Sequence, residues 1–592
     1  MIAVSVEDKA KHPGISDLIA DTNLVGSYIA NALVTDYLHP HFWTLGRTAP
    51  QLTVAEDRIR CAKDWFEACD KGGHRGCKPT EGFLPTRLID LRANHAVRLV
   101  HVNRLDKQEE RLRYATLSHC WGSPEVAGPL KTTKERAEAF GKGISEGMLP
   151  KTFRDAIRVT RSLGIPFLWI DSLCIIQDDP DKWQREASRM KHVYSGSVLT
   201  ISASCGRDSS SGFLPEDDVE IEGINPIPGL EQDVTVKASP LITNNEHLGH
   251  FSFDYRNHRV GRQQGVMVRL QTDPTTRQLE EAHLSTRGWA CQEEILSRRI
   301  LHCLDSEIVW KCERLCHTQS GRTTEELRAI SRAGMIKPTL VEDWCYWIQD
   351  YTTRDFTISS DRMPAFSGIA ELFQDLLHQK ILLGVRRESL SKDLSWIRLG
   401  PEKGPADTGA PSWSWLSCNA PVYLDYWKLP NDEINPQACT VPINCSVDWT
   451  GPAMTSPIQK TLFRIRGPVM QMALRIAPES LTCNPPYFLV GEEASDFSQG
   501  PLPWRYVGQF DHESHPGCVK AEYTCLLLFS RTNEDGITYR EVFLLLSPDT
   551  ETWEDGQLET AKPCRFNRVG IAMIRGSEKT FSRAQERTLD LS

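Results

Sequence analysis

Three short segments of the chain carry no charged side chain and have the length of buried strands. They lie at residues 114–118, 167–170 and 198–201. Residues 167–170 are apolar at every position, which is typical of a strand covered on both faces of a sheet. The pattern therefore predicts three strands within a stretch of about 90 residues, long enough for parallel crossovers.

Segments with helical periodicity separate these strands. Between residues 150 and 163, apolar side chains recur at three- and four-residue spacing, and Gly164 follows, which predicts a helix that ends there. Asp179 and Pro180 supply an N-cap and a first-turn proline, and one apolar stripe runs on from Trp183 to Tyr194. Strand and helix in alternation predict an α/β fold with a parallel sheet and right-handed crossovers.

The rest of the chain is predicted to surround this α/β region. Helical signals return at 287–296, runs at 300–304 and 308–311 suggest an edge hairpin, and the sequence becomes strand-rich after residue 411. The predicted division is a loosely ordered leader at 1–60, an extension packed on the core at 61–110, the α/β domain at 111–318 with an insertion at 206–283, a helical region at 319–410 and a β-rich region at 411–592.

Composition and charge narrow the classes of protein. Of 592 residues, 40% are hydrophobic and 25% are charged, which is ordinary for a globular protein. A net charge of −10 without a long basic run argues against nucleic-acid binding. No segment approaches the roughly 18 apolar residues of a membrane span, and the acidic start does not resemble a secretory signal. We therefore expect a cytoplasmic protein whose 18 cysteines are reduced.

Polar side chains gather where the three predicted strands end. Ser118, His119, Asp171 and Cys174 follow the first two strands, and a Ser-Ala-Ser-Cys run at 202–205 follows the third. Ligands bind at this edge of a parallel sheet, so a nucleophile–base site is one interpretation. The alternative is that Ser and Cys fit tight turns and Asp171 caps one, which the lack of a G-x-S-x-G motif favours.

Two Cys/His groups are candidates for zinc. One consists of Cys61, Cys69, His74 and Cys77, and the other of Cys303, Cys312, Cys316 and His317. Neither has the paired C-x₂-C spacing of structural zinc sites, so the sequence favours buried thiols and predicts no metal. The absence of Walker and G-x-G-x-x-G motifs argues against enzymes that bind nucleoside triphosphates or dinucleotides in those ways.

Three sequence blocks resemble those of the heterokaryon-incompatibility (HET) domain of filamentous fungi. They are Tyr114-Ala-Thr-Leu-Ser-His-Cys-Trp-Gly122, Phe167-Leu-Trp-Ile-Asp-Ser-Leu-Cys-Ile-Ile-Gln177 and Arg287-Gly-Trp-Ala-Cys-Gln-Glu293. Order and spacing match as well, and Ala410-Pro-Ser-Trp-Ser-Trp415 resembles a further feature of long HET proteins. His119 departs from the Tyr that the family often has. The resemblance implies a role in allorecognition and programmed cell death.

The HET domain is in turn similar to Toll/interleukin-receptor (TIR) domains, some of which cleave NAD. The resemblance thus implies a TIR-like α/β fold with NAD as a substrate and no required cofactor. Ser285, Trp289 and Glu293 resemble the Ser…Trp…Glu pattern of the TIR catalytic helix. Glu293 is the catalytic candidate, with Glu186 as the second choice. The pocket is expected to include Ser118, His119, Trp121, Asp171, Cys174, Arg287 and Trp289.

Two functions remain open from the sequence. In the first, the chain is a cell-death effector that hydrolyses NAD, with activity that requires self-association. In the second, it is a non-enzymatic signalling module in which the HET domain self-associates and the C-terminal region recognises a protein partner. Under the second, Trp289 is a core anchor and Glu293 is a solvated or salt-bridged helix residue. Glu186 is then an exposed helix-face residue near Arg185 and Arg189. The sequence names neither the trigger nor the partner.

Overall fold

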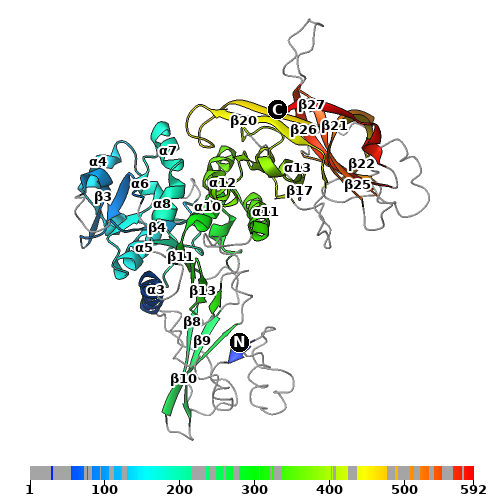
Figure 1. Cartoon of the computed structure of the whole chain (residues 1–592). Coiled ribbons are helices and arrows are strands. Elements are labelled where there is room, and N and C mark those ends of the chain that lie inside the picture. The colour runs from blue at the N-terminus through cyan, green and yellow to red at the C-terminus, as the bar shows by residue number, and fades with distance from the viewer. Residues whose placement is uncertain are drawn as a thin grey trace. The chain divides into compact units, whose positions relative to one another are not determined.

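The chain forms two compact units in a computed structural model (Figure 1). The first unit consists of Met1–Asp179, His192–Thr286 and Ser297–Ser331, and the second of Pro180–Lys191, Arg287–Leu296 and Arg332–Ser592. The structure describes residues 55–72, 77, 83–93, 95–105, 112–122, 130–215, 279, 281–305, 307–319, 337–401, 403, 408–424, 437–476, 506–511, 520–532, 539–549, 565–576 and 579–592, and the strand backbone at 28–30, 235–240, 249–257, 262–270, 323–325 and 487–490.

The centre of the first unit is a mixed sheet whose middle strands are parallel. Strands β6 (Phe167–Trp169), β4 (Tyr114–Ser118), β7 (Leu199–Ser202) and β11 (Arg299–Cys303) lie side by side in that order. Antiparallel strands continue the sheet on both sides: β2 (Arg87–Asp90), β3 (Ala96–His101) and β5 (Ile144–Ser145) beyond β6, and β12 (Ile308–Cys312), β13 (Leu315–Thr318) and β14 (Thr323–Glu325) beyond β11. The predicted α/β class is confirmed.

Helices connect the parallel strands as the sequence predicted, with one difference. Helix α5 (Lys151–Ser162) precedes β6, and its apolar side chains Phe153 and Ile157 are buried. The second predicted helix is in fact two, α7 (Pro180–Ala187) and α8 (Met190–Gly196), separated at Ser188 and Arg189. The stripe from Trp183 to Tyr194 predicted one helix because its spacing continues across that break. Helix α7 belongs to the second unit. The first unit also contains the helices α3 (Ala55–Asp70), α4 (Arg136–Lys142) and the short α6 (Asp171–Cys174).

The hairpin predicted at the sheet edge lies in the interior. Strands β11 and β12 do pair antiparallel, but β11 also pairs in parallel with β7, so it closes the parallel part of the sheet. The prediction was wrong on this point because pairing between β7 and β11 joins residues about 100 positions apart and leaves no local pattern. In the insertion, β8 (Thr235–Pro240), β9 (Gly249–Asn257) and β10 (Arg262–Leu270) form an antiparallel sheet with β1 (Tyr28–Ala30).

The second unit begins with a helical layer. It contains α7, α10 (Gly288–Leu296), α11 (Lys337–Thr353), α12 (Pro364–Leu377) and α13 (Leu390–Asp393), with contacts of α10 to both α11 and α12. The small strand pairs β15 (Ile381–Leu382) with β16 (Val385–Arg386) and β17 (Ile397–Arg398) with β18 (Val422–Tyr423) follow. The helical character expected for 319–410 is thus present from Lys337 to Leu377. No described helix is both long and apolar enough to cross a membrane.

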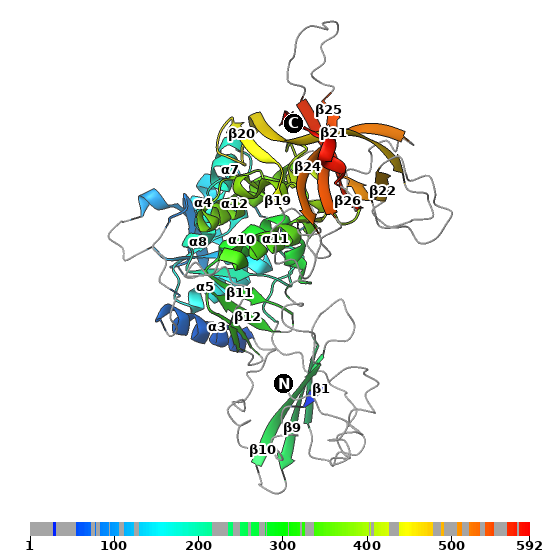
Figure 2. The same ribbon diagram turned by 45° about the vertical axis from the view of Figure 1, so that its right-hand side comes forward.

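The C-terminal strands form a mainly antiparallel sheet that closes on itself, with one parallel pair between its last two strands (Figure 2). Its strands are β19 (Gln437–Ala438), β20 (Val441–Trp449), β21 (Ile458–Ile476), β22 (Tyr487–Val490), β23 (Tyr506–Phe510), β24 (Lys520–Thr532), β25 (Tyr539–Pro548), β26 (Arg565–Gly576) and β27 (Gln585–Leu591). The long β21 pairs with β22 at one end and with β24 in its second half, which completes the ring. The predicted β-rich C-terminal region is confirmed.

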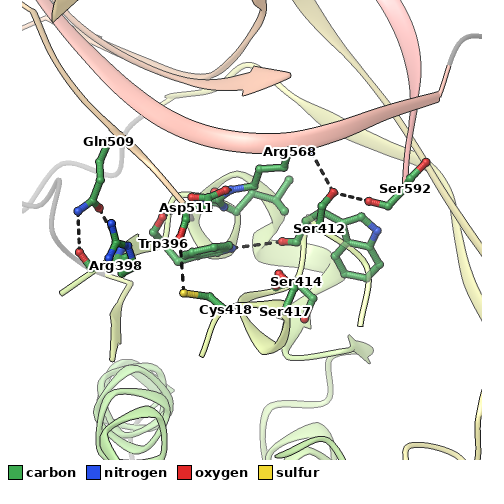
Figure 3. A network of polar contacts seen from close by, with 12 residues as sticks. Trp396, Arg398, Ser412, Ser414, Ser417, Cys418, Gln509, Asp511, Arg568 and Ser592 are labelled. Carbon is green, nitrogen blue, oxygen red and sulfur yellow. Dashed lines mark hydrogen bonds and ion pairs between the residues drawn. The ribbon is translucent and has the colours of Figure 1, made fainter. Parts of the chain in front are cut away.

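A buried arginine joins the helical layer of the second unit to its sheet. Arg568 donates to both carboxylate oxygens of Asp511, at 2.8 and 3.0 Å, and to the carbonyls of Leu394 and Trp396, both at 2.7 Å. Its guanidinium lies 3.5 Å from the centre of the Trp396 ring (Figure 3). All of these donors have acceptors, so the buried charge is both paired and hydrogen-bonded.

The Ser412-Trp-Ser-Trp415 motif fixes the same junction. Ser412 accepts a hydrogen bond from the backbone N–H of Arg568 at 2.9 Å and donates to the carbonyl of Ser592 (Figure 3). Ser414 donates to the carbonyl of Leu383 at 2.6 Å. Both tryptophans of the motif are fully buried. The motif therefore acts as a structural joint within the second unit.

Candidate functional site

The carboxyl ends of the parallel strands in the first unit carry a row of polar side chains. Ser118 at the end of β4 is in register with Ser202 of β7, and Ser202 is in register with His302 of β11. Paired residues of neighbouring parallel strands point to the same face of a sheet, so these three side chains share one face. All three are buried. The sequence predicted the first two, and the third comes from the unexpected pairing of β11.

A serine links this row together. Ser204, two residues past the end of β7, has its Oγ 2.9 Å from Oγ of Ser202 and 3.3 Å from Nδ1 of His302. Sequence reasoning missed His302 because its strand was expected at the sheet edge. The only local signal for it was a histidine in an otherwise apolar strand, which is more often a buried structural residue.

Asp171 is held by two hydrogen bonds at the N-terminus of α6. Its Oδ2 accepts from the indole Nε1 of Trp121 at 2.8 Å, and its Oδ1 accepts from the backbone N–H of Ser172 at 2.7 Å. The Nδ1 of His119 lies 3.9 Å from Oδ1 of Asp171, and the His119 ring packs edge-on against Phe153. A carboxylate fixed in this way can orient a neighbouring imidazole.

A tight turn positions Trp121. Gly122 has a φ of +93°, and a Cβ at this position would lie 2.8 Å from the Cβ of Asp208, so only glycine fits. Ser209 donates to the carbonyl of Trp121 at 3.3 Å. Burial opposes ionisation of Asp208, but hydrogen bonds from Ser210 and Ser211 outweigh this and lower its pKa. The 208–211 loop therefore braces the turn that carries the indole.

Cys174 closes the short helix α6 and is buried. Its backbone carbonyl accepts a long hydrogen bond of 3.4 Å from Nη1 of Arg87. Cys174, three residues after Asp171, therefore fits both sequence-based interpretations, a residue that fits a tight turn and a residue that lines a pocket.

The third sequence block lies in the second unit and carries Trp289 on α10. The indole Nε1 of Trp289 donates to Oδ2 of Asp361 at 3.1 Å, and its ring meets the Trp183 ring edge-on with centroids 6.3 Å apart. Burial raises the pKa of Asp361, and the hydrogen bond from Trp289 and the charge of Arg287 offset this only in part. Trp289 thus has fixed contacts within the second unit.

Glu293 and Glu186 are both buried, with exposed fractions of 6% and 7%. Glu293 is on α10. The preceding residue, Gln292, accepts a hydrogen bond from the backbone N–H of Gly368 on α12 at 2.8 Å. Glu186 is on α7. Burial of a carboxylate is costly unless the surroundings compensate it, so neither glutamate is a fully solvated helix-face residue, and this burial fits a catalytic carboxylate and a salt-bridged one equally.

Arg287 precedes α10 and has a backbone role. It forms an isolated parallel bridge with Asp355, and its carbonyl accepts from Nη1 of Arg354 at 3.5 Å. Arg354 in turn donates to Oδ2 of Asp350 at 2.7 and 2.9 Å. These contacts fix the start of α10 against the end of α11.

The predicted site residues therefore fall into two groups. Ser118, His119, Trp121, Asp171 and Cys174 belong to the first unit, and Glu186, Arg287, Trp289 and Glu293 to the second. Each group lies on elements that pack within its own unit. The sequence-based prediction that all nine line one pocket stays a prediction.

Comparison with known proteins gives one match. Residues 114–293 match the family described as heterokaryon incompatibility protein (HET). The matched segment starts at the first residue of β4 and ends at Glu293, so it includes all nine predicted site residues, whereas His302 lies beyond its end. No curated protein and no solved structure matches the chain.

Proposed function

We infer from the HET domain at residues 114–293 that the chain has a heterokaryon-incompatibility-type function, and we propose that it acts as a cell-death effector by hydrolysing NAD. Glu293 is the proposed catalytic carboxylate. The observation that carries the proposal is the placement of this buried glutamate on α10, one helical turn after Trp289. Residues four apart on a helix lie on one face, so the carboxylate and the indole are neighbours.

The surroundings of Trp289 support this assignment. Its hydrogen bond to Asp361 and its edge-on contact with Trp183 hold the indole in one orientation. A fixed aromatic wall beside a buried carboxylate suits a ligand that has a flat ring joined to a ribose. Catalytic groups gain from being held in place before the substrate arrives.

The reaction is the cleavage of the nicotinamide–ribose bond by water, which gives nicotinamide and ADP-ribose. The bond breaks through an oxocarbenium-like state in which positive charge develops on the ribose. The negative charge of Glu293 stabilises that state, and water then attacks the ribose carbon and loses its proton. In this scheme Ser118, Asp171 and the other predicted pocket residues line the site, and self-association is required for activity.

The test is nicotinamide release from NAD by the purified, concentrated full chain. Glu293→Gln keeps the size of the side chain and removes its charge, so we expect the rate to fall on the order of 100-fold or more. The matched control is Glu294→Gln, the adjacent carboxylate, whose Oε2 lies 3.7 Å from Nη2 of Arg354. It is expected to keep close to the wild-type rate.

Each outcome separates the parts of the proposal. No release of nicotinamide by concentrated wild-type protein would end the NAD hydrolysis proposal. Release that Glu186→Gln abolishes and Glu293→Gln does not would move the catalytic role to Glu186. Ser118→Ala and Asp171→Asn in the same assay test the predicted pocket, with an increase in KM expected for both.

A non-enzymatic signalling module is the second candidate. It is favoured by the contacts that already engage the two key polar positions, Trp289 with Asp361 and Asp171 with Trp121. Under this function, cell death on overexpression would be as strong with Glu293→Gln as with wild type, and cellular NAD would stay constant. Cell death that disappears together with NAD depletion in the variant supports the enzyme.

A further inference from the structure

Three cysteines far apart in the sequence meet in the first unit. Cys69 is near the end of α3, and Cys312 is the last residue of β12. Cys77 follows α3 in the sequence. All three are buried and none is in a disulfide. Their sulfur atoms lie within 4.8 Å of one another, and this is the one such group of potential metal ligands among the described residues.

We propose that Cys69, Cys77 and Cys312 bind a structural zinc ion through three thiolates. A tetrahedral site with Zn–S bonds of about 2.3 Å places its sulfurs about 3.8 Å apart. Three sulfurs within 4.8 Å of one another can reach that geometry with small side-chain rotations. An all-sulfur donor set without carboxylates favours zinc over magnesium or calcium.

Hydrogen bonds around the sulfurs suit a site that holds thiolates. The Nε of Arg299, which is itself buried, donates to the sulfur of Cys69 at 3.1 Å. The backbone N–H groups of Arg314 and Leu315 donate to the sulfur of Cys312. Such outer contacts orient metal ligands and stabilise their charge.

The charges at the site also balance. Three thiolates and a divalent ion leave one net negative charge, which the guanidinium of Arg299 offsets. Arg299 also lies 3.8 Å from Oδ1 of Asp70 and donates to the carbonyl of Val198, so its buried charge has partners beside the thiolates. Arg299 is the first residue of β11 and lies opposite Cys312 in the pairing of β11 with β12, which places its side chain near the cysteines.

The site would fasten the N-terminal helix to the sheet that carries the HET motifs. Helix α3 already contacts β12, and Arg58 on α3 donates to the carbonyl of Leu304 at 2.9 Å. A shared ion between Cys69 and Cys312 adds a cross-link at the other end of this helix. In the sequence, Cys69 and Cys77 belong to one candidate Cys/His group and Cys312 to the other, and neither group has C-x₂-C spacing. The three cysteines come together only in the folded chain.

The experiment measures bound zinc in the untagged full chain, expressed with added zinc and purified without chelators. We expect one zinc ion per chain in the wild type and a loss of most of it in Cys312→Ser and in Cys77→Ser. The matched control is Cys303→Ser, a buried free cysteine in the neighbouring strand β11 that is outside the group. It is expected to keep one zinc ion.

A second measurement uses only the wild-type protein, so it remains informative if the cysteine variants do not fold. X-ray absorption at the zinc edge of the wild type should show a shell of about three sulfur atoms at roughly 2.3 Å. Wild-type protein without zinc, a shell dominated by nitrogen and oxygen, unchanged zinc content in Cys312→Ser, or a disulfide among the three cysteines would each overturn the proposal.

Discussion

At the scale of single residues, buried charges hold the second unit together. Arg568 is fully buried and its guanidinium donates to Asp511 and to two backbone carbonyls. Trp396 lies under the same group. Nothing in the local sequence around Arg568 distinguishes it from the many surface arginines, so its role is visible only in the structure.

Replacement of Arg568 by Met is expected to destabilise the protein by about 3–5 kcal/mol, because it leaves the carboxylate of Asp511 buried without its partner. Chemical denaturation, followed by tryptophan fluorescence, measures the change. Arg464→Met is the matched control: Arg464 also pairs with an aspartate, Asp590, at 2.7 Å, but its side chain is exposed. Asp590 is buried but the Arg464 side chain is 39% exposed, so water can partly replace the lost cation and the cost should be smaller than for Arg568→Met. Equal losses in the two variants would contradict the assignment.

Asp361 gives a prediction for pH dependence. Burial raises its pKa, so between the ordinary aspartate pKa of about 3.9 and the raised value the folded state binds the proton more tightly than the unfolded state. The contribution of this group to the free energy of unfolding therefore decreases as the pH rises through that window.

Asp361→Asn should remove this contribution while its amide oxygen still accepts from Trp289. We expect the variant to gain stability relative to wild type as the pH rises above about 4. Urea denaturation of both proteins at a series of pH values checks this. A constant difference between the two curves across the series would show that Asp361 does not titrate as proposed.

At the scale of elements, α10 depends on close packing at its first residue. A Cβ on Gly288 would lie 1.9 Å from a ring carbon of Phe356, so the helix can approach that ring only with glycine. The motif Arg287-Gly-Trp289 thus combines a backbone bridge, a close approach and an anchored indole. The helix was predictable from the sequence, but the need for this glycine was not.

Gly288→Ala is therefore expected to destabilise the protein by about 1–3 kcal/mol, as overpacking does. Gly141→Ala is the control, since Gly141 is also in a helix, α4, and a Cβ there would meet only the Leu99 carbonyl at 3.7 Å. That change should stabilise by up to about 1 kcal/mol through helix propensity. Thermal unfolding measures both, and a stabilising Gly288→Ala would refute the packing argument.

At the scale of the whole molecule, the family match and the compact units do not coincide. The HET segment ends at Glu293, inside α10, and both α7 and α10 belong to the second unit. Within that unit, Trp289 bonds to Asp361, Gln292 to Gly368, and Gln184 to the carbonyl of Thr455. The HET segment therefore obtains part of its packing from residues well beyond its own end.

A fragment of residues 55–331 is thus expected to be largely insoluble or to aggregate, because α7 and α10 lose these partners. Co-expression with residues 332–592 should restore a soluble complex, which size-exclusion chromatography would detect. A monodisperse fragment with a cooperative unfolding transition would show that the second unit is not needed. In that case the fragment becomes the better protein for testing cell death.

The sequence by itself determined the local elements of this protein: the strands β4, β6 and β7, the helix α5, the α/β class, the β-rich C-terminal region and the three HET blocks. These depend on periodicity and short motifs, which involve residues close together in the chain. Only the tertiary structure decided that β11 joins the parallel strands, that α10 packs in the second unit, and that Cys69, Cys77 and Cys312 meet. Apart from Cys69 and Cys77, which are eight positions apart, those contacts join residues more than 70 positions apart in the chain, where packing and burial of charge select the partner and no local pattern records the choice.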